Sequence, residues 1–195
     1  MTPLFYVDLS AAATTVKNND GMSAFLPVMG RGFTVLHGVF SRFPGSYAMA
    51  LPNLREGEHR HPGNVIRVFG ETRESVDALL DNIEQHPVFK GEAYFRVSRV
   101  RQIPEGYSGD GVAYVRHRIP ARGNKKSRKP PEYRARRLAE AERFPYFSVS
   151  SKSTKQVFSL HVGMRKGSPG GLATPDSYGL STSEKPLFLP VLGTV

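Results

Sequence analysis

The segment from Thr72 to Pro87 constrains the fold most, because it contains the clearest periodic pattern in the chain. Its apolar side chains recur at i, i+3, i+4 and i+7, the spacing of one helix face: Val76, Leu79, Leu80 and Ile83. Thr72 is a residue type that caps helix N-termini, and Pro87 cannot continue a helix. The sequence therefore predicts an amphipathic helix that must bury one face against another layer.

Other elements of the first hundred residues surround this helix. Leu4–Leu9 and Ala93–Val100 are predicted strands, and an apolar, glycine-bounded stretch within residues 22–43 is predicted to contain a helix. Tyr47–Leu51 and Val65–Phe69 are two more strands, separated by a polar loop and able to pair as a hairpin. The order strand, helix, strand, strand, helix, strand is that of the ferredoxin-like (RRM-like) fold. That fold hosts many functions and specifies none.

The second half of the chain has a different character. Gly106–Pro131 is rich in Gly, Lys, Arg and Pro and is predicted to be a long loop, and Glu132–Arg143 is predicted to be a helix without a wide apolar face. Two predicted strands follow: Tyr146–Ser150 and Gln156–Met164. We expect an α+β protein, with a ferredoxin-like domain in residues 1–103. A smaller domain with an arginine-rich helix and short antiparallel strands is expected in residues 104–195.

The charge distribution points to a polyanionic partner. The chain has 27 Lys and Arg against 17 Asp and Glu, a formal net charge of +10. Residues 116–143 alone hold eleven Lys and Arg against three Glu. A basic helix that binds membranes would present a broad apolar face, which this stretch lacks, so nucleic acid is the better-supported partner.

Several classes of protein lose support from residues that the sequence lacks. There is no cysteine, which excludes disulfides, thiolate nucleophiles and cysteine-ligated zinc. No glycine loop of the P-loop or dinucleotide type, no His-Glu-x-x-His helix and no Gly-x-Ser-x-Gly elbow is present. No apolar stretch long enough for a signal peptide or membrane span follows Met1, so we expect a cytoplasmic protein.

Six histidines are candidates for proton transfer, and only their placement separates them. His37 lies at the margin of an apolar stripe, where a half-buried structural histidine is the plainer interpretation. His59 and His61 could contact one metal ion together with Glu56 or Glu58, but no further ligand has the spacing of a metal site. The residue pattern by itself leaves an enzyme and a basic RNA-binding protein about equally supported.

Separated motifs, taken in order, resemble the repeat-processing endoribonucleases of type I-F CRISPR systems. The first three are Leu36–His37, Val97–Val100 and the arginine-rich stretch Pro131–Leu138. Ser151–Phe158 resembles the Ser-x-Ser-Thr-x-Gln-x-Phe strand of that family, and Ser177–Ser181 resembles its near-terminal Tyr-Gly-Leu-Ser. The resemblance covers most of the chain and is strongest at the C-terminal motifs.

The resemblance implies an active site formed by His37, Ser151 and Tyr178, with Ser153 in support. These side chains suit attack by an RNA 2′-hydroxyl on its adjacent phosphate, because that reaction needs a proton acceptor and alignment of the nucleophile. No metal ion, cofactor or thiolate is required. The expected products are a 2′,3′-cyclic phosphate and a 5′-hydroxyl, and DNA should resist cleavage because it lacks the nucleophile.

The resemblance also implies which residues bind the RNA hairpin. Arg99 matches an arginine that pairs bidentately with a guanine near the base of the stem. A glutamine two residues later in the family is replaced here by Arg101, with Gln102 following. Further phosphate contacts are expected from the basic loop and the first half of the arginine helix: Arg128, Lys129, Arg134, Arg136 and Arg137.

Three hypotheses result. The first is a hairpin endoribonuclease that processes precursor CRISPR RNA and stays on its product as a subunit of the interference complex. The second is a non-catalytic RNA-hairpin-binding protein in which His37 is structural. The third, a metal-dependent nuclease using His59 and His61, has the least support and predicts sensitivity to chelators.

Overall fold

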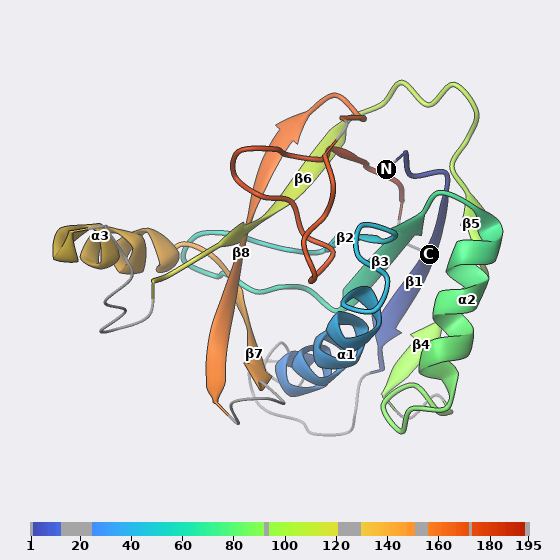
Figure 1. Ribbon diagram of the computed structural model, residues 1–195, viewed down its shortest axis with the longest axis horizontal. Coiled ribbons are helices and arrows are strands. Elements are labelled where there is room, and N and C mark those ends of the chain that lie inside the picture. Colours follow the sequence, from blue (N-terminus) through green and yellow to red (C-terminus); the bar gives the residue numbers. More distant parts are fainter. Residues whose placement is uncertain are drawn as a thin grey trace.

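Two antiparallel sheets and three helices make up the described part of the chain (Figure 1). The computed structural model describes residues 2–12, 25–91, 94–120, 130–150, 156–171 and 173–193. None of the described helices is long and apolar enough to cross a membrane. The predicted α+β class is therefore correct.

The first sheet and its two helices have the predicted ferredoxin-like order. The strands are β1 (Phe5–Ala11), β2 (Ala48–Ala50), β3 (Val65–Gly70), β4 (Phe95–Val97) and β5 (Arg101–Gln102), and the helices are α1 (Phe25–Phe40) and α2 (Arg73–Glu84). The strands lie in the order β2-β3-β1-β4, with β5 also pairing with β1. The predicted hairpin forms, because β2 pairs antiparallel with β3.

Helix α2 begins and ends close to the predicted residues. The Thr72 side chain accepts a hydrogen bond from the backbone N–H of Ser75, and the Ser75 hydroxyl is in turn placed to bond the Thr72 backbone, which completes a capping box. Val76, Leu79 and Ile83 are buried, as their spacing indicates. Local capping and an apolar face therefore account for this helix.

The second sheet contains the main correction to the sequence-based prediction. Its strands are β6 (Gly111–His117), β7 (Tyr146–Ser150), β8 (Val157–Gly167) and β9 (Leu189–Pro190), in the order β7-β8-β6-β9. The prediction of a continuous loop over Gly106–Pro131 is wrong for β6, which pairs with β8 along its whole length. The strand was missed because Gly, Pro and basic residues flank it and its apolar segment is short. Its buried positions include Ala113 and Val115.

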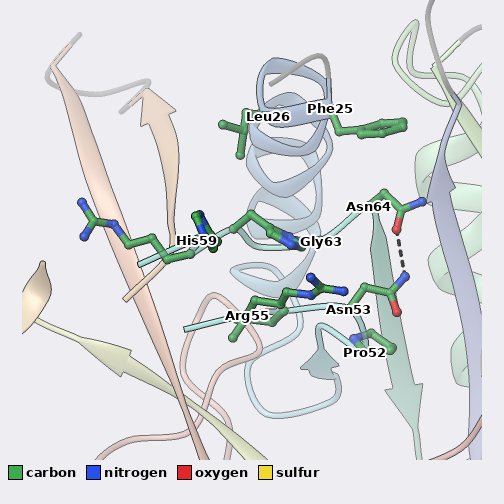
Figure 2. Close-up of a pocket in the computed structure, with 11 residues that line it drawn as sticks. Phe25, Leu26, Pro52, Asn53, Arg55, His59, Gly63 and Asn64 are labelled. Carbon is green, nitrogen blue, oxygen red and sulfur yellow. Dashed lines mark hydrogen bonds between the residues drawn. The ribbon is translucent and has the colours of Figure 1, made fainter. Parts of the chain in front are cut away.

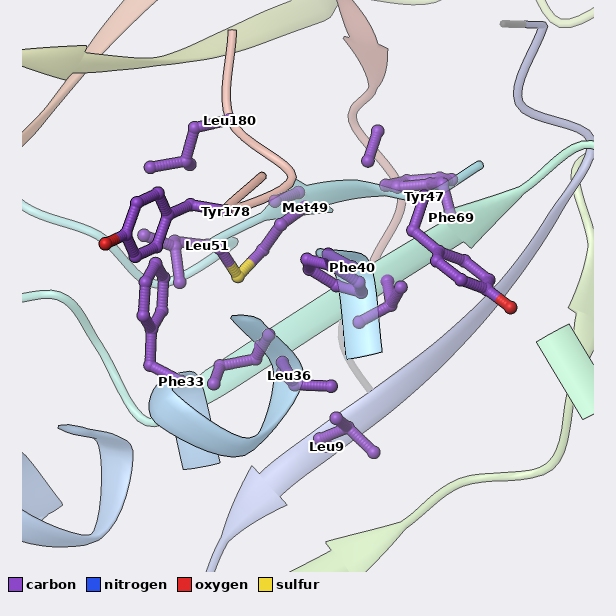
Figure 3. Packing of buried hydrophobic residues seen from close by; sticks show 14 of the residues in the cluster. Leu9, Phe33, Leu36, Phe40, Tyr47, Met49, Leu51, Phe69, Tyr178 and Leu180 are labelled. Atoms are coloured by element: carbon purple, nitrogen blue, oxygen red, sulfur yellow. The ribbon is translucent and has the colours of Figure 1, made fainter. Parts of the chain in front are cut away.

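Both sheets contribute to one hydrophobic cluster. Phe33 of α1 stacks on Phe147 of β7 with ring centroids 4.5 Å apart, which joins the helix of the first sheet to the second sheet. Figure 3 shows Tyr178 and Leu180 packed over Phe33 and Leu51 in this cluster. The cluster therefore brings the near-terminal turn onto helix α1, although the two are far apart in sequence.

Candidate active site

His37 lies in the last turn of α1 and is half-buried. Its Nδ1 atom is 2.6 Å from the backbone carbonyl oxygen of Ser177. A carbonyl oxygen only accepts hydrogen bonds, so Nδ1 carries the hydrogen. In the neutral imidazole the lone pair is then on Nε2, the atom free to accept a proton. Ser41 lies one turn later, with its hydroxyl 3.4 Å from the same Nδ1.

The Tyr178 ring lies flat against the His37 ring. The centroids are 3.9 Å apart and the planes differ by 7°. On the same helix Phe33 stacks against Tyr178 with centroids 5.7 Å apart, and the Tyr178 side chain is buried. Figure 3 shows its hydroxyl pointing away from the labelled core residues. Packing therefore fixes the ring and leaves the hydroxyl at the edge of the core beside the imidazole.

A tight turn holds Ser177 and Tyr178 in place. One carboxylate oxygen of Asp176, Oδ1, accepts hydrogen bonds from the backbone N–H groups of Tyr178 and Leu180, at 2.9 and 3.2 Å. Gly179 has φ +72°, and a Cβ there would lie 2.8 Å from Cε2 of Phe40. Only glycine suits that conformation and that close approach. The turn is thus pressed onto α1, where its carbonyl reaches His37.

Arg116 of β6 supplies a positive charge to this group. Its guanidinium carbon lies 4.5 Å from the centroid of the Tyr178 ring, and its Nη1 is 3.7 Å from Oδ2 of Asp176, an ion pair rather than a hydrogen bond. Burial, and then the neighbouring Arg118, lower the pKa of Arg116 from its ordinary value, while Asp176 and Tyr178 raise it. The guanidinium keeps its charge, because an arginine stays protonated in proteins.

Sequence reasoning missed Arg116 and Asp176 as parts of the site. Arg116 was counted only as one charge of a basic stretch, and no strand was predicted around it. Asp176 stands two residues before Tyr178, the spacing of an Asx-turn, and that signal could have been found from the sequence. The role of the Ser177 carbonyl has no sequence signal, because a backbone atom provides it.

Helix α3 (Pro131–Ala141) projects from one end of the molecule (Figure 1). Polar bonds hold its base. His117 Nε2 donates to the Arg137 carbonyl at 2.8 Å, and the Nε atoms of Arg134 and Arg137 donate to the backbone carbonyls of Pro120 and Arg118. Arg136 is exposed, and its Nε lies 3.7 Å from Oε1 of Glu140, an i, i+4 ion pair. These hydrogen bonds explain how α3, which has little apolar surface, stays in place.

A basic groove lies under α3. It has a volume of about 570 Å³ and lies between the base of α3 and strands β6 and β8. Its basic lining residues are Arg116, His117, Arg118, Arg134 and His161. Arg116 lines this groove and also contacts Tyr178, so it connects the groove to the histidine.

The structure brings together two of the four expected catalytic residues, His37 and Tyr178. Ser151 and Ser153, as well as the expected phosphate-binding Arg128 and Lys129, lie outside the described residues. Strand β7 ends at Ser150, whose partner Val157 lines a hollow together with Leu26 in the first turn of α1.

The expected base-reading residues lie in another part of the molecule. Arg101 and Gln102 form β5, which pairs with β1 opposite Tyr6 and Phe5. Arg99 is exposed in the break between β4 and β5. The Ser98 hydroxyl accepts from the backbone N–H of Asp8 and donates to the Arg99 carbonyl, which shapes this break. Figure 1 shows this edge of the first sheet on the side of the molecule opposite α3.

One histidine and one glutamate of the third hypothesis have other partners. His61 Nδ1 accepts a hydrogen bond from the backbone N–H of Gly63 at 3.0 Å, and Glu56 Oε1 accepts from that of Met164 at 2.5 Å. Across the residues that the structure describes, no three His, Asp or Glu side chains gather as ligands of one metal ion.

Comparison with known proteins gives one match that bears on these observations. No curated protein matches the chain. The family model described as CRISPR-associated protein (Cas_Csy4) matches residues 15–188, which include His37, both C-terminal motifs and the arginine helix. The match supports a CRISPR-associated, repeat-processing protein of a generally nuclease-like kind. Since the matched region takes in nearly every residue of the site described above, the chain belongs to the Cas_Csy4 family of CRISPR-associated proteins.

Proposed function

We propose that the protein is a metal-independent endoribonuclease of the type I-F class, which binds a CRISPR repeat hairpin and cuts it at the base of the stem. The observation that carries this proposal is the His37–Tyr178 pair, in which the Ser177 carbonyl occupies Nδ1 and leaves Nε2 available. A histidine in that state can act as a general base. Family membership supports a CRISPR repeat as the class of RNA.

The reaction needs one proton acceptor and an aligned nucleophile. His37 Nε2 takes the proton of the ribose 2′-hydroxyl, and the 2′-oxygen forms a bond to the adjacent phosphorus. The bond between phosphorus and the 5′-oxygen breaks, that oxygen takes a proton from a solvent water, and protonated His37 returns its proton to solvent. The products are a 2′,3′-cyclic phosphate and a 5′-hydroxyl. We assign His37 the role of general base; the Nδ1–H bond to the Ser177 carbonyl leaves Nε2 as the ring nitrogen that can exchange a proton with the RNA.

The other side chains position the reacting groups. Tyr178 holds the imidazole plane by stacking, and its hydroxyl is assigned to bond the scissile phosphate. The charge of Arg116 stabilises negative charge that grows on the phosphate oxygens in the transition state. Ser151 is assigned by resemblance to hold the 2′-hydroxyl in line, with Ser153 in support.

The hairpin stem is placed along α3 and the basic groove beneath it. The exposed Arg136, together with Arg134 and Arg137, faces the phosphates, and Arg128 and Lys129 extend the contact. Residues 104–195 thus act as the hairpin-binding part, and residues 1–103 carry the catalytic histidine. The base pair at the stem end is read by three residues of the first sheet: Arg99, Arg101 and Gln102.

After cleavage the protein stays bound to the mature crRNA as a cytoplasmic subunit of the type I-F interference complex. The physical basis is that the stem contacts do not change when the phosphate at its base is cut. Charge contacts of this kind supply much of the affinity for a nucleic acid. No cofactor takes part.

A cleavage assay in chelator tests the proposed function. One substrate is a repeat hairpin RNA, and the other carries a single 2′-deoxy substitution at the scissile nucleotide. Cleavage of the first substrate alone, with a 2′,3′-cyclic phosphate end, is the expected result. Tight binding without cleavage would instead show the non-catalytic hairpin-binding protein, and cleavage abolished by chelator would show a metal-dependent nuclease.

A further inference from the structure

The loop between β2 and β3 lines a second hollow that the proposed cleavage does not use. The hollow has a volume of about 960 Å³ and lies between this loop and the first turn of α1. Figure 2 shows Arg55 and His59 on the loop, with Phe25 and Leu26 of α1 on the opposite wall. Arg60 and His61 complete the basic lining. Two arginines and two histidines therefore surround one open space.

The loop is held in a defined shape. Arg55 and His61 exchange two backbone hydrogen bonds, of 2.9 and 3.0 Å, which close residues 56–60 into a small hairpin. Gly63 has φ +81°, and a Cβ there would lie 2.8 Å from Asn53. Glycine is therefore required where the two arms of the loop pass each other this closely. The side-chain amide of Asn53 donates to Asn64 at 2.8 Å (Figure 2). The basic side chains thus project from a preorganised backbone.

The acidic residues of the loop do not line the hollow. The Glu56 carboxylate binds the backbone N–H of Met164 in β8, and the backbone N–H of Gly57 donates to the Arg143 carbonyl. These two bonds attach the loop to the second sheet and keep one carboxylate away from the hollow. Glu58 is exposed at the tip of the small hairpin. The hollow therefore keeps a positive potential.

His61 contributes a hydrogen-bond donor rather than a charge. Its Nδ1 accepts from the Gly63 N–H, so the hydrogen of the neutral ring is on Nε2. Burial and then the nearby Arg55 lower the pKa of His61, which agrees with this neutral form. The charges of the site are those of Arg55 and Arg60. Two guanidinium groups with a neutral donor beside them are suited to phosphate oxygens.

A shallow groove leads from the catalytic end of α1 to this hollow. It has a volume of about 460 Å³ and follows α1 beside β7, from Thr34 to Leu26. Leu26 lines both the groove and the hollow. His37 follows Thr34 on the same helix face, and it lies roughly 16 Å along the axis from Leu26 at 1.5 Å per residue. That length fits a few nucleotides of extended single-stranded RNA.

We propose that the hollow is a second RNA site, which takes phosphates of the single-stranded RNA that adjoins the cut at the base of the hairpin. This inference rests on the proposed function, because the cut at His37 defines where the flanking strand begins. The apolar wall of Leu26 and the arginines opposite it suit a strand whose phosphates face Arg55 and Arg60. The site adds affinity for the flanked precursor and none for the bare hairpin.

Binding measurements on three RNAs test the site. Each RNA carries the 2′-deoxy substitution that blocks cleavage: a hairpin that ends at the cut, the same hairpin with a single-stranded 5′ extension, and one with a 3′ extension beyond the scissile phosphate. The test variant is Arg55→Gln with Arg60→Gln. The control is Arg73→Gln with Lys90→Gln, which removes the same charge from exposed positions away from the hollow. Arg55 and Arg60 are exposed, and matched unfolding midpoints check that both variants fold.

The expected result is a selective loss. For at least one extended RNA, the test variant binds about tenfold more weakly than the control, and the slope of log affinity against log salt falls by about 1.4, which is 0.7 for each of two phosphates. Affinity for the bare hairpin matches the control. An equal loss on all three RNAs, or no loss on either extended RNA, overturns the second RNA site. The proposed enzyme is still supported in either case if the wild-type protein cleaves the hairpin that lacks the 2′-deoxy substitution. A wild-type protein that neither binds nor cuts the hairpin overturns both proposals.

Discussion

At the scale of single residues, the orientation of one ring decides what the site can do. His37 contacts three groups. The Ser177 carbonyl and the Tyr178 ring come from a distant part of the chain, and the Ser41 hydroxyl lies one helical turn away. Their combined effect is to fix the ring plane and its tautomer. A half-buried histidine in either role would bond its Nδ1 hydrogen in this way. A cleavage measurement on a His37 variant therefore separates the catalytic hypothesis from the structural one.

Replacing His37 by Ala is expected to reduce the rate of hairpin cleavage by about 10²- to 10⁴-fold, the usual contribution of one general base. Hairpin affinity should stay close to that of the wild type, because the phosphate-binding groups on α3 are untouched. Single-turnover cleavage and binding, measured on the same RNA, check both statements. His86→Ala is the control, since His86 is an exposed histidine beyond α2. Loss of binding as well as cleavage would mean that His37 supports the fold.

At the scale of elements, the contact between α1 and β7 sets the position of the helix that carries His37. Gly30 lets the two approach so closely that a Cβ there would lie 2.8 Å from the Ser148 carbonyl oxygen. One turn further, Phe33 stacks on Phe147. Helix α3 is attached differently, through hydrogen bonds from arginine Nε atoms to backbone carbonyls. Helix α1 is thus fixed by packing, and the basic helix α3 by polar bonds.

Two glycines of α1 give opposite expectations for the same change. Gly38→Ala should raise the free energy of unfolding by about 0.5 to 1 kcal/mol, because alanine is the better helix former and nothing lies within 4 Å of the added methyl group. Gly30→Ala should lower it by about 1 to 3 kcal/mol, since the methyl group meets backbone that cannot move aside cheaply. Urea unfolding of both variants checks the pair. Two stabilised variants would show that α1 and β7 are not in close contact.

At the scale of the whole molecule, both sheets depend on distant tertiary contacts. Buried Arg67 of β3 binds the Asp8 carboxylate through two bonds of 2.6 and 2.8 Å and also donates to the carbonyls of Leu192 and Gly193. It therefore ties the centre of the first sheet to the end of the described chain. In the second sheet, the paired strands β6 and β8 place His117 opposite His161. These histidines connect stability to pH.

Stability should fall as the pH drops below about 6.5. Burial lowers the pKa of His61, His117 and His161 from 6.5, so the unfolded chain binds more protons than the folded one in the range below that value. The stability that these neutral histidines contribute is fully present above their pKa in the unfolded chain. It is lost as the pH falls through their lower pKa values in the folded protein. Urea midpoints between about pH 7.5 and pH 5.5 measure it. His161→Gln should reduce the dependence, and His86→Gln should leave it as in the wild type. An unchanged slope in His161→Gln would contradict the assignment.

Much of the fold could be predicted from local sequence. Thr72 with the spacing of Val76, Leu79 and Ile83 was enough for α2, because capping and one apolar face depend on neighbours within a few residues. The strand β6 could not be found in this way. Its polar Arg116 and His117 become acceptable in a strand only when Asp176, Tyr178 and the Arg137 carbonyl are placed beside them.

The sequence by itself determined the α+β order, the basic character and the motifs that single out His37 and Tyr178. Only the tertiary structure decided that these two rings stack, that Ser177 orients the imidazole and that Arg116 stands beside them. The physical reason is the distance along the chain: 140 residues separate His37 from the carbonyl that orients it. Periodicity reports contacts within one element, whereas a site of this kind exists only after a shared core has brought remote segments together.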